Sequence, residues 1–232
     1  MHEIEKKAAG KAAAAMVEDG MLLGLGTGST VDFFLRALGE RVADGLMVRG
    51  VASSLRTAHL CKRLHIEMLD LASVNEVDLC VDGADELDRQ FHMIKGGGGA
   101  LLREKMVASI ARHVTIIVDS TKLVTTLGAF PLPVEVNCFG YQLVERRLRA
   151  LGIAPRLRLS DNAPYLTDNG HYILDCSMGA IPDPVGLEAK LKSLTGVIDT
   201  GLFLGLCHTA IIGRGTEVEI RRRDFEKGTS SL

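Results

Sequence analysis

The sequence predicts an α/β fold in which helices cover both faces of a mostly parallel sheet, with a smaller α+β unit inserted into it. Short apolar runs alternate with segments of helical periodicity along most of the chain. Strands that alternate with helices form βαβ units, and their strands pair in parallel. The pattern changes near Gly128, after which the order of the elements is that of a ferredoxin-like unit.

The first part of the chain repeats one arrangement, in which a short apolar run leads into a loop and usually a helix. An alanine-rich helix is expected over residues 8–17. The apolar runs that predict strands are residues 21–25, 47–51, 77–81, 91–94 and 114–118. Apolar residues recur at helical spacing after residue 30, and further helices are expected up to Leu64 and over residues 100–111.

A different unit begins where residues 130–133 (Phe-Pro-Leu-Pro) break the pattern, which is typical of a domain crossing. Its expected elements are a strand at 134–136, a helix at 141–151, a strand at 156–159, a hairpin-like strand across 167–170, a helix at 185–194 and a strand at 197–200. This β-α-β-β-α-β order is ferredoxin-like.

The sequence therefore predicts two domains. Residues 1–127 and 201–232 form the main α/β domain, and residues 128–200 form the inserted domain. Residues 208–212 are expected to return to the first sheet. The three arginines at 221–223 are expected on an exposed strand face or tail, and residues 228–232 as a frayed tail.

Composition excludes several classes of protein. The 27 Lys and Arg residues oppose 29 Asp and Glu residues, which argues against a nucleic-acid binder with a clustered basic face. No apolar run reaches the roughly 18 residues that span a bilayer, and the charged start lacks a signal-peptide segment. The five cysteines form no Cys-x-x-Cys pair. We expect a cytoplasmic protein with no membrane or nucleic-acid partner.

The first candidate loop for ligand binding is residues 24–30 (Gly-Leu-Gly-Thr-Gly-Ser-Thr), between a strand and a helix. Ligands of open α/β sheets bind at the carboxyl ends of strands, where a helix N-terminus favours an anion. The loop is not a P-loop because no Lys precedes Ser29, and Ser29 also replaces the third glycine of the dinucleotide pattern. It either binds a compact phosphate monoester or uses its hydroxyls only as helix caps.

The second loop, residues 82–86, carries the carboxylates of Asp82, Asp85 and Glu86 at a strand end. Clustered carboxylates favour Mg²⁺, and a solvated acidic turn is a further alternative. Lys95 and Lys122 follow equivalent strand ends, so they can supply the positive charge in place of a metal.

The third loop consists of Lys95 and four glycines, followed by a helix that carries Glu104. Each glycine costs about 0.5–1 kcal/mol relative to alanine in a regular element, so a plain flexible linker is hard to justify here. Helical geometry tilts the Glu104 side chain back towards the glycines. We therefore expect a carboxylate beside the ligand.

Together these three loops, with residues 103–105 and 119–122 and, within the insert, residues 132–136 and 167–170, resemble ribose-5-phosphate isomerase, type A. The resemblance extends from the first helix to residues 201–203. It implies interconversion of D-ribose 5-phosphate and D-ribulose 5-phosphate in the pentose phosphate pathway, without a metal or other cofactor, by a homodimer or homotetramer. Two positions depart from the family pattern: Thr121 stands where Ser is usual, and His171 where Asn is usual.

The resemblance also assigns site residues. Glu104 is the implied proton acceptor, with Lys95, Asp82 and Asp85 as further catalytic residues. The implied substrate contacts are Thr27, Gly28, Ser29, Thr30, Asp82, Gly83, Ala84, Asp85, Lys95, Gly96, Gly97, Gly98, Lys122 and Lys6. Our hypothesis is that Lys95 and the glycine-loop amides stabilise a cis-enediolate, while Asp82 and Asp85 hold sugar hydroxyls and relay protons.

Two other interpretations stay open at this point. A sugar-phosphate sensing module would bind the same ligand without turnover, but sensing does not need Glu104 and Lys95. An aminosugar-phosphate deaminase or a coenzyme A transferase would share the broad fold. Deaminase chemistry needs a catalytic histidine, whereas His92 and His113 are expected to be structural.

Overall fold

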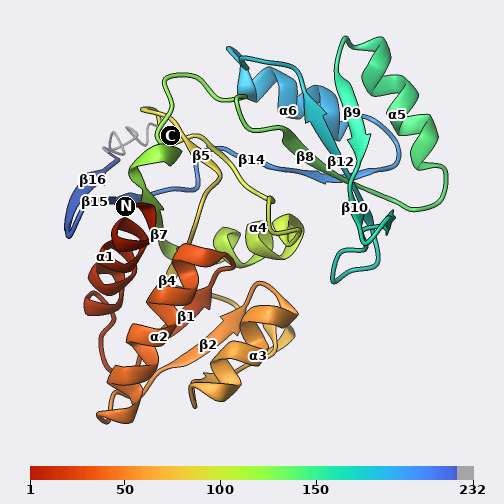
Figure 1. The fold of residues 1–232 in the computed structure, drawn as a ribbon. Coiled ribbons are helices and arrows are strands. Elements are labelled where there is room, and N and C mark those ends of the chain that lie inside the picture. The colour runs from red at the N-terminus through yellow and green to blue at the C-terminus, as the bar shows by residue number, and fades with distance from the viewer. Residues whose placement is uncertain (224–232) are drawn as a thin grey trace, which may run out of the picture.

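The computed structural model describes residues 1–223 and confirms an α/β fold built on a mostly parallel sheet (Figure 1). The seven strands lie in the order β16-β15-β7-β4-β1-β2-β3. Only β15 and β16 pair antiparallel in this sheet. The strands are β1 (Leu22–Leu25), β2 (Arg49–Ala52), β3 (Glu67–Met68), β4 (Val77–Asp82), β7 (Ala111–Asp119), β15 (Thr209–Arg214) and β16 (Glu217–Arg222).

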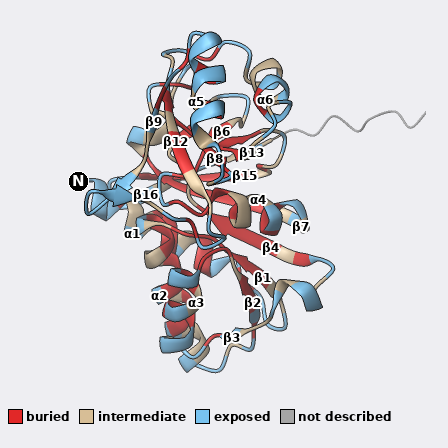
Figure 2. Ribbon diagram, turned by 90° about the vertical axis from the view of Figure 1, so that its right-hand side faces the viewer, coloured by how far each residue is buried: buried red, intermediate tan, exposed pale blue. Residues whose placement is uncertain are grey.

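Helices cover both faces of this sheet, and the strands alternate their side chains between two apolar cores. One face packs against α1 (His2–Ala15), α2 (Ser29–Ala43) and α3 (Leu55–Arg63). The other face packs against α4 (Leu101–Ser109). Along β7, Ile117 belongs to the first core while Ile116 and Val118 belong to the second, as a period of two requires. In Figure 2 the central strands are buried and the outer helix surfaces are exposed.

The segment at 91–94, predicted as one more strand of the parallel sheet, lies elsewhere. It forms β6 (Met93–Ile94), which pairs antiparallel with β5 (Glu86–Leu87) and β14 (Leu202–Phe203) in a separate three-stranded sheet. Only ten residues, 83–92, separate β4 from β6. A parallel crossover needs a dozen residues or more, so the chain turns back instead. The small sheet packs on the α4 side through Leu87, Met93 and Phe203.

The inserted part has the predicted ferredoxin-like order. It consists of β8 (Leu132–Val136), α5 (Tyr141–Ala150), β9 (Ala154–Leu157), β12 (Tyr172–Ser177), α6 (Pro184–Lys192) and β13 (Val197–Thr200). Its four strands form an antiparallel sheet in the order β13-β8-β12-β9, with a separate apolar core. The short strands β10 (Leu159–Ser160) and β11 (Ala163–Pro164) form a small hairpin beside it. The domain boundaries at 127/128 and 200/201 stay a prediction.

Two 3₁₀ turns, η1 (Leu71–Ser73) and η2 (Ser120–Lys122), complete the secondary structure of residues 1–223. Arg221 and Arg222 lie on β16, the edge strand, as the sequence predicted. The predicted tail at 228–232 lies outside the described residues. None of the described helices combines the length and the apolar character that crossing a membrane requires.

Candidate active site

A cavity opens at the carboxyl ends of β1 and β4, where the predicted loops converge. This is the edge of an open α/β sheet at which ligands bind. The residues that line it are Lys6, Thr27, Gly28, Ser29, Thr30, Gly83, Ala84, Asp85, Lys95, Gly96, Gly98, Glu104 and Lys122. Two of the predicted site residues, Asp82 and Gly97, are not part of this lining.

One end of the cavity is suited to an anion. Helix α2 begins at Ser29, so its first backbone N–H groups and its dipole face this end. The Lys6 Nζ atom, from α1, donates a hydrogen bond to Ser29 Oγ at 2.9 Å. Lys122, from η2, adds a second cation to the lining. Two ammonium groups and a helix N-terminus together fit a phosphate group.

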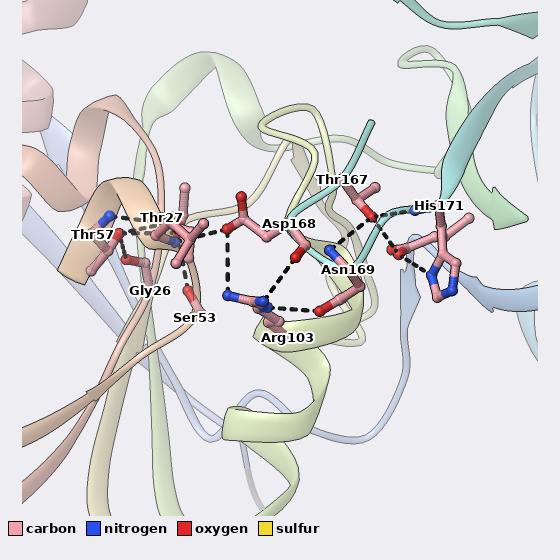
Figure 3. Close-up of polar contacts among 12 residues, drawn as sticks. Gly26, Thr27, Ser53, Thr57, Arg103, Thr167, Asp168, Asn169 and His171 are labelled. Carbon is pink, nitrogen blue, oxygen red and sulfur yellow. Dashed lines mark hydrogen bonds and ion pairs between the residues drawn. The ribbon is translucent and has the colours of Figure 1, made fainter. Parts of the chain in front are cut away.

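Below this loop, a cluster of hydroxyl groups holds Thr27 in place (Figure 3). The Thr27 Oγ1 atom lies 3.0 Å from Ser53 Oγ, 2.8 Å from Ser54 Oγ and 3.1 Å from Thr57 Oγ1. Thr57 Oγ1 in turn donates to the carbonyl oxygen of Gly26 at 2.8 Å. All four side chains are buried, so their hydrogen bonds make the loop conformation costly to change.

The other end of the cavity contains a buried cation between two carboxylates. The Nζ atom of Lys95 lies 2.9 Å from Asp82 Oδ2 and 3.3 Å from Glu104 Oε2. It also donates to the carbonyl oxygen of Gly83 at 2.6 Å. Each of the three charged side chains is about 95% buried or more. Apart from this ion pair with Lys95, Glu104 Oε2 has no hydrogen-bond partner among the described residues.

Burial shifts the ionisation of this group of residues. Loss of solvent raises the pKa of Glu104, and this effect outweighs the opposing influence of the Lys95 ammonium. Burial alone would lower the pKa of Lys95, but the carboxylates of Asp82 and Glu104 outweigh it and raise that pKa. Lys95 is therefore a permanent cation beside a carboxylate that binds a proton more readily than an exposed glutamate.

Asp82 lies outside the cavity lining and bonds to three groups of the protein. Its Oδ1 atom accepts hydrogen bonds from the backbone N–H groups of Thr27 at 3.0 Å and Gly83 at 2.8 Å. Its Oδ2 atom faces Lys95. This carboxylate thus links the first loop, the second loop and the Lys95 ammonium. The predicted contact between Asp82 and the sugar hydroxyls stays a prediction.

The other two carboxylates of the second loop point elsewhere. Asp85 lines the cavity, and its Oδ2 atom accepts a hydrogen bond from the N–H of Gly97 at 2.7 Å. Glu86 is buried away from the cavity and accepts from the N–H groups of Gly128 and Phe130 at 2.7 Å and 2.5 Å. The three carboxylates of this loop therefore bond to different parts of the protein and do not gather at one point.

The two histidines considered for deaminase chemistry lie away from the cavity lining. His92 Nδ1 lies 3.2 Å from a carboxylate oxygen of Asp88. His113 Nε2 lies 2.9 Å from Thr209 Oγ1. Both therefore have structural partners.

Comparison with known proteins agrees with this geometry. A family model described as ribose 5-phosphate isomerase A (phosphoriboisomerase A) matches residues 49–217. The chain belongs to this family. The ribose-5-phosphate isomerase A of Thermomicrobium roseum is 50% identical over 224 residues, which cover 95% of this chain and 94% of the relative. Ribose-5-phosphate isomerase A 1 of Oceanobacillus iheyensis is 48% identical over 217 residues, covering 93% and 97% of the two chains.

Solved structures of the ribose 5-phosphate isomerase family share the whole fold. The enzyme of Methanocaldococcus jannaschii superposes with a TM-score of 0.90 at 37% identity, covering 94% of this chain and 98% of that one. A D-ribose-5-phosphate isomerase in complex with phospho-erythronic acid gives a TM-score of 0.93 at 35% identity, covering 96% and 100%.

Part of the site lies outside the residues that the sequence pattern indicated. Ser53 and Ser54 follow β2, which neighbours β1, so the strand-end rule could have placed them beside Thr27. Arg158 had no such signal, because it comes from the inserted part. Its Nη1 atom donates to the carbonyl oxygens of Gly96 and Gly97 at 2.8 Å and 3.2 Å.

The turn at 167–170 of the inserted part also reaches the site (Figure 3). Asp168 Oδ2 accepts a hydrogen bond at 2.7 Å from the N–H of Leu55, the first residue of α3. Arg103, the neighbour of Glu104 on α4, donates to Asn169 Oδ1 at 2.8 Å and to the carbonyl oxygen of Asp168 at 2.9 Å. His171, the departure from the family pattern, lies 2.9 Å from Glu135 and does not line the cavity.

Proposed function

We propose that this chain interconverts D-ribose 5-phosphate and D-ribulose 5-phosphate, with Glu104 as the base. The observation that carries this proposal is the Glu104 carboxylate, buried 3.3 Å from the Lys95 ammonium at one end of a cavity whose other end suits a phosphate. The names of the relatives support the same reaction.

The reaction moves a carbonyl group from C1 to C2 of the sugar. Glu104 takes the proton from C2 of the aldose to give a cis-enediolate, the hydroxyl proton passes from O2 to O1, and Glu104 returns its proton to C1. Because the two carbons are neighbours, one carboxylate serves both. The raised pKa of Glu104 makes it a stronger base than an exposed glutamate once it has lost its proton, which favours this transfer.

Lys95 keeps the charge of the site balanced during the transfer. When Glu104 takes the proton it becomes neutral, and the negative charge appears on the enediolate oxygen. The Lys95 donor that faced Glu104 can then turn to that oxygen, while Asp82 holds the ammonium in place. A preorganised donor of this kind accelerates a reaction by about 10²–10³-fold.

The phosphate fixes the sugar so that C1 and C2 lie against Glu104. We assign this role to Lys6, Ser29, Thr30, Lys122 and the N-terminus of α2. Asp85 lines the cavity between the two ends and is the carboxylate assigned to the sugar hydroxyls. A relative has been solved in complex with phospho-erythronic acid, and this ligand, which carries a carboxylate and a phosphate, supports a phosphorylated sugar as the substrate class.

The test is turnover of ribose 5-phosphate by the purified chain with EDTA present, together with E104Q. Gln has the size of Glu but cannot accept the proton. We expect E104Q to lose about 10²–10⁴-fold in kcat and to lose exchange of the C2 hydrogen with solvent, while still binding the substrate. Exchange that survives in E104Q would assign the base elsewhere. A wild-type chain that binds but does not turn over the sugar would indicate the sensing module, and activity lost with EDTA would favour the metal site.

We propose in addition a homodimer or homotetramer in the cytoplasm, with no nucleic-acid or membrane partner. All five cysteines are free, which is usual in a reducing compartment. Phe139 is 93% exposed and Leu143 is 43% exposed on the inserted part, and large exposed apolar side chains favour protein contacts. Sedimentation of the full chain as a monomer would contradict the oligomer.

A further inference from the structure

The glycine loop, residues 96–99, has a backbone with a single hydrogen bond between its own residues. Gly96 and Gly99 have φ values of 106° and 78°, and one turn hydrogen bond joins Gly99 N–H to the Gly96 carbonyl at 3.0 Å. Glycine loses more conformational freedom on ordering than any other residue. A loop of four glycines that lines a catalytic cavity therefore needs partners from outside to hold one conformation.

The inserted part supplies such a partner in Arg158. Its Nη1 atom donates to the Gly96 and Gly97 carbonyls, as described above, while its Nε atom donates to Asp175 Oδ2 at 2.9 Å and its Nη2 atom to Asp175 Oδ1. The guanidinium thus uses one edge for the carboxylate and a third nitrogen for the loop. This fork geometry is specific to arginine, because a lysine ammonium cannot make both sets of bonds at fixed angles.

Tyr165, seven residues after Arg158, lies against Gly99 at the other end of the loop. The ring of Tyr165 lies 6.0 Å from the Arg158 guanidinium carbon, and the Tyr165 N–H donates to the Arg158 carbonyl at 2.9 Å. A Cβ atom at Gly99 would lie 2.2 Å from the Tyr165 hydroxyl oxygen. The loop is therefore enclosed by Arg158 at its start and by Tyr165 at its end.

We propose that Arg158, oriented by Asp175, is a positioning residue that holds the glycine loop in the conformation that stabilises the enediolate. This inference rests on the proposed isomerase function. With its carbonyls bonded to Arg158, the peptide groups of Gly96 and Gly97 have a fixed orientation, and the Gly97 N–H meets Asp85 at the cavity. Arg158 itself does not line the cavity, so its effect on the reaction passes through the loop.

The experiment compares wild type, R158M, R158K and R149M. Arg149 also forms an ion pair, with Glu145 on α5 of the inserted part, but it does not contact the loop, so R149M is the matched control. For each variant, kcat and KM for ribose 5-phosphate are measured, together with the inhibition constant of phospho-erythronic acid and the melting temperature.

We expect R158M to lose about 100-fold in kcat, because misplacing catalytic groups by about 1 Å costs that much. KM should change little, since the phosphate end is untouched, and phospho-erythronic acid should bind more weakly in proportion to the fall in kcat/KM. R158K should recover part of this loss, and R149M should match wild type.

A kcat and inhibition constant for R158M equal to those of R149M would overturn the proposal, as would a change in KM alone. If R158M does not fold, R158K decides by the same comparison. An inactive wild type would instead contradict the proposed function, so the two failures are distinguishable.

Discussion

Among the single residues of the site, Glu104 stands out because its carboxylate is buried, and burial makes its ionisation costly. Glu104 is 3% exposed, and burial raises its pKa in spite of the neighbouring Lys95. The folded protein therefore binds this proton more tightly than the unfolded chain does. The bound proton therefore adds fully to the free energy of unfolding when the pH is below 4.5, the ordinary pKa of Glu104. This contribution is lost as the pH rises through the raised pKa of the folded protein. The property that makes Glu104 a strong base thus lowers stability near neutral pH.

We therefore predict that E104Q is more stable than wild type above neutral pH. The amide has no ionisation cost, so the melting temperature of E104Q should exceed that of wild type by several degrees, at about 2–4 °C per kcal/mol for a chain of this size. The difference should shrink as the pH falls towards 4.5. Thermal unfolding followed by circular dichroism across this pH range checks the prediction. A gap independent of pH would show that Glu104 does not titrate as described.

At the element scale, the carboxyl ends of β1 and β4 are joined so closely that no side chain fits between them. A Cβ atom on Gly26 would lie 2.1 Å from Asp82 Oδ1. That oxygen holds the N–H groups of Thr27 and Gly83, and the same carboxylate holds Lys95. Because β1 and β4 lie so close together, Asp82 fixes the first loop (residues 24–30) against the second loop (residues 82–86).

We therefore predict that G26A damages the site beyond its effect on stability. Asp82 must move away, and Lys95 loses its fixed partner, so kcat/KM should fall by about 100-fold or more. Overpacking of this kind costs about 1–3 kcal/mol in stability. Steady-state kinetics and thermal unfolding of the same preparation separate the two effects. Full activity in a folded G26A protein would show that the Asp82 carboxylate can shift without harm.

At the scale of the whole molecule, the inserted part holds the helix that carries the base. Arg103 and Lys105 lie on either side of Glu104 in α4, and both bond to the inserted part. Lys105 Nζ lies 2.7 Å from Asp199 Oδ1 and 2.9 Å from the Thr200 carbonyl. Arg103 bonds to the turn at 167–170, which also caps α3 through Asp168. The inserted part therefore helps to hold α4, and with it Glu104, in position.

D168A tests this support. Loss of the Leu55 N–H acceptor resembles loss of a helix cap, which costs about 1 kcal/mol, and the half-exposed ion pair with Arg103 adds little. The melting temperature should therefore fall by about 2–4 °C. E217A, at an exposed position on β16, is the control and should match wild type. If D168A is as stable as E217A, the turn at 167–170 does not stabilise α3, and the prediction is wrong.

Local patterns in the sequence were sufficient to predict the parallel α/β order, the ferredoxin-like insert and the loops that line the cavity. They were sufficient because these features depend on local periodicity and on one general rule, that ligands lie at the carboxyl ends of parallel strands. Three features are visible only in the folded molecule: β6 leaves the parallel sheet, Asp82 forms an ion pair with Lys95, and Arg158 bonds to Gly96, a residue 62 positions away. Such contacts depend on how segments that are far apart in the sequence pack together, and local sequence patterns do not predict this packing.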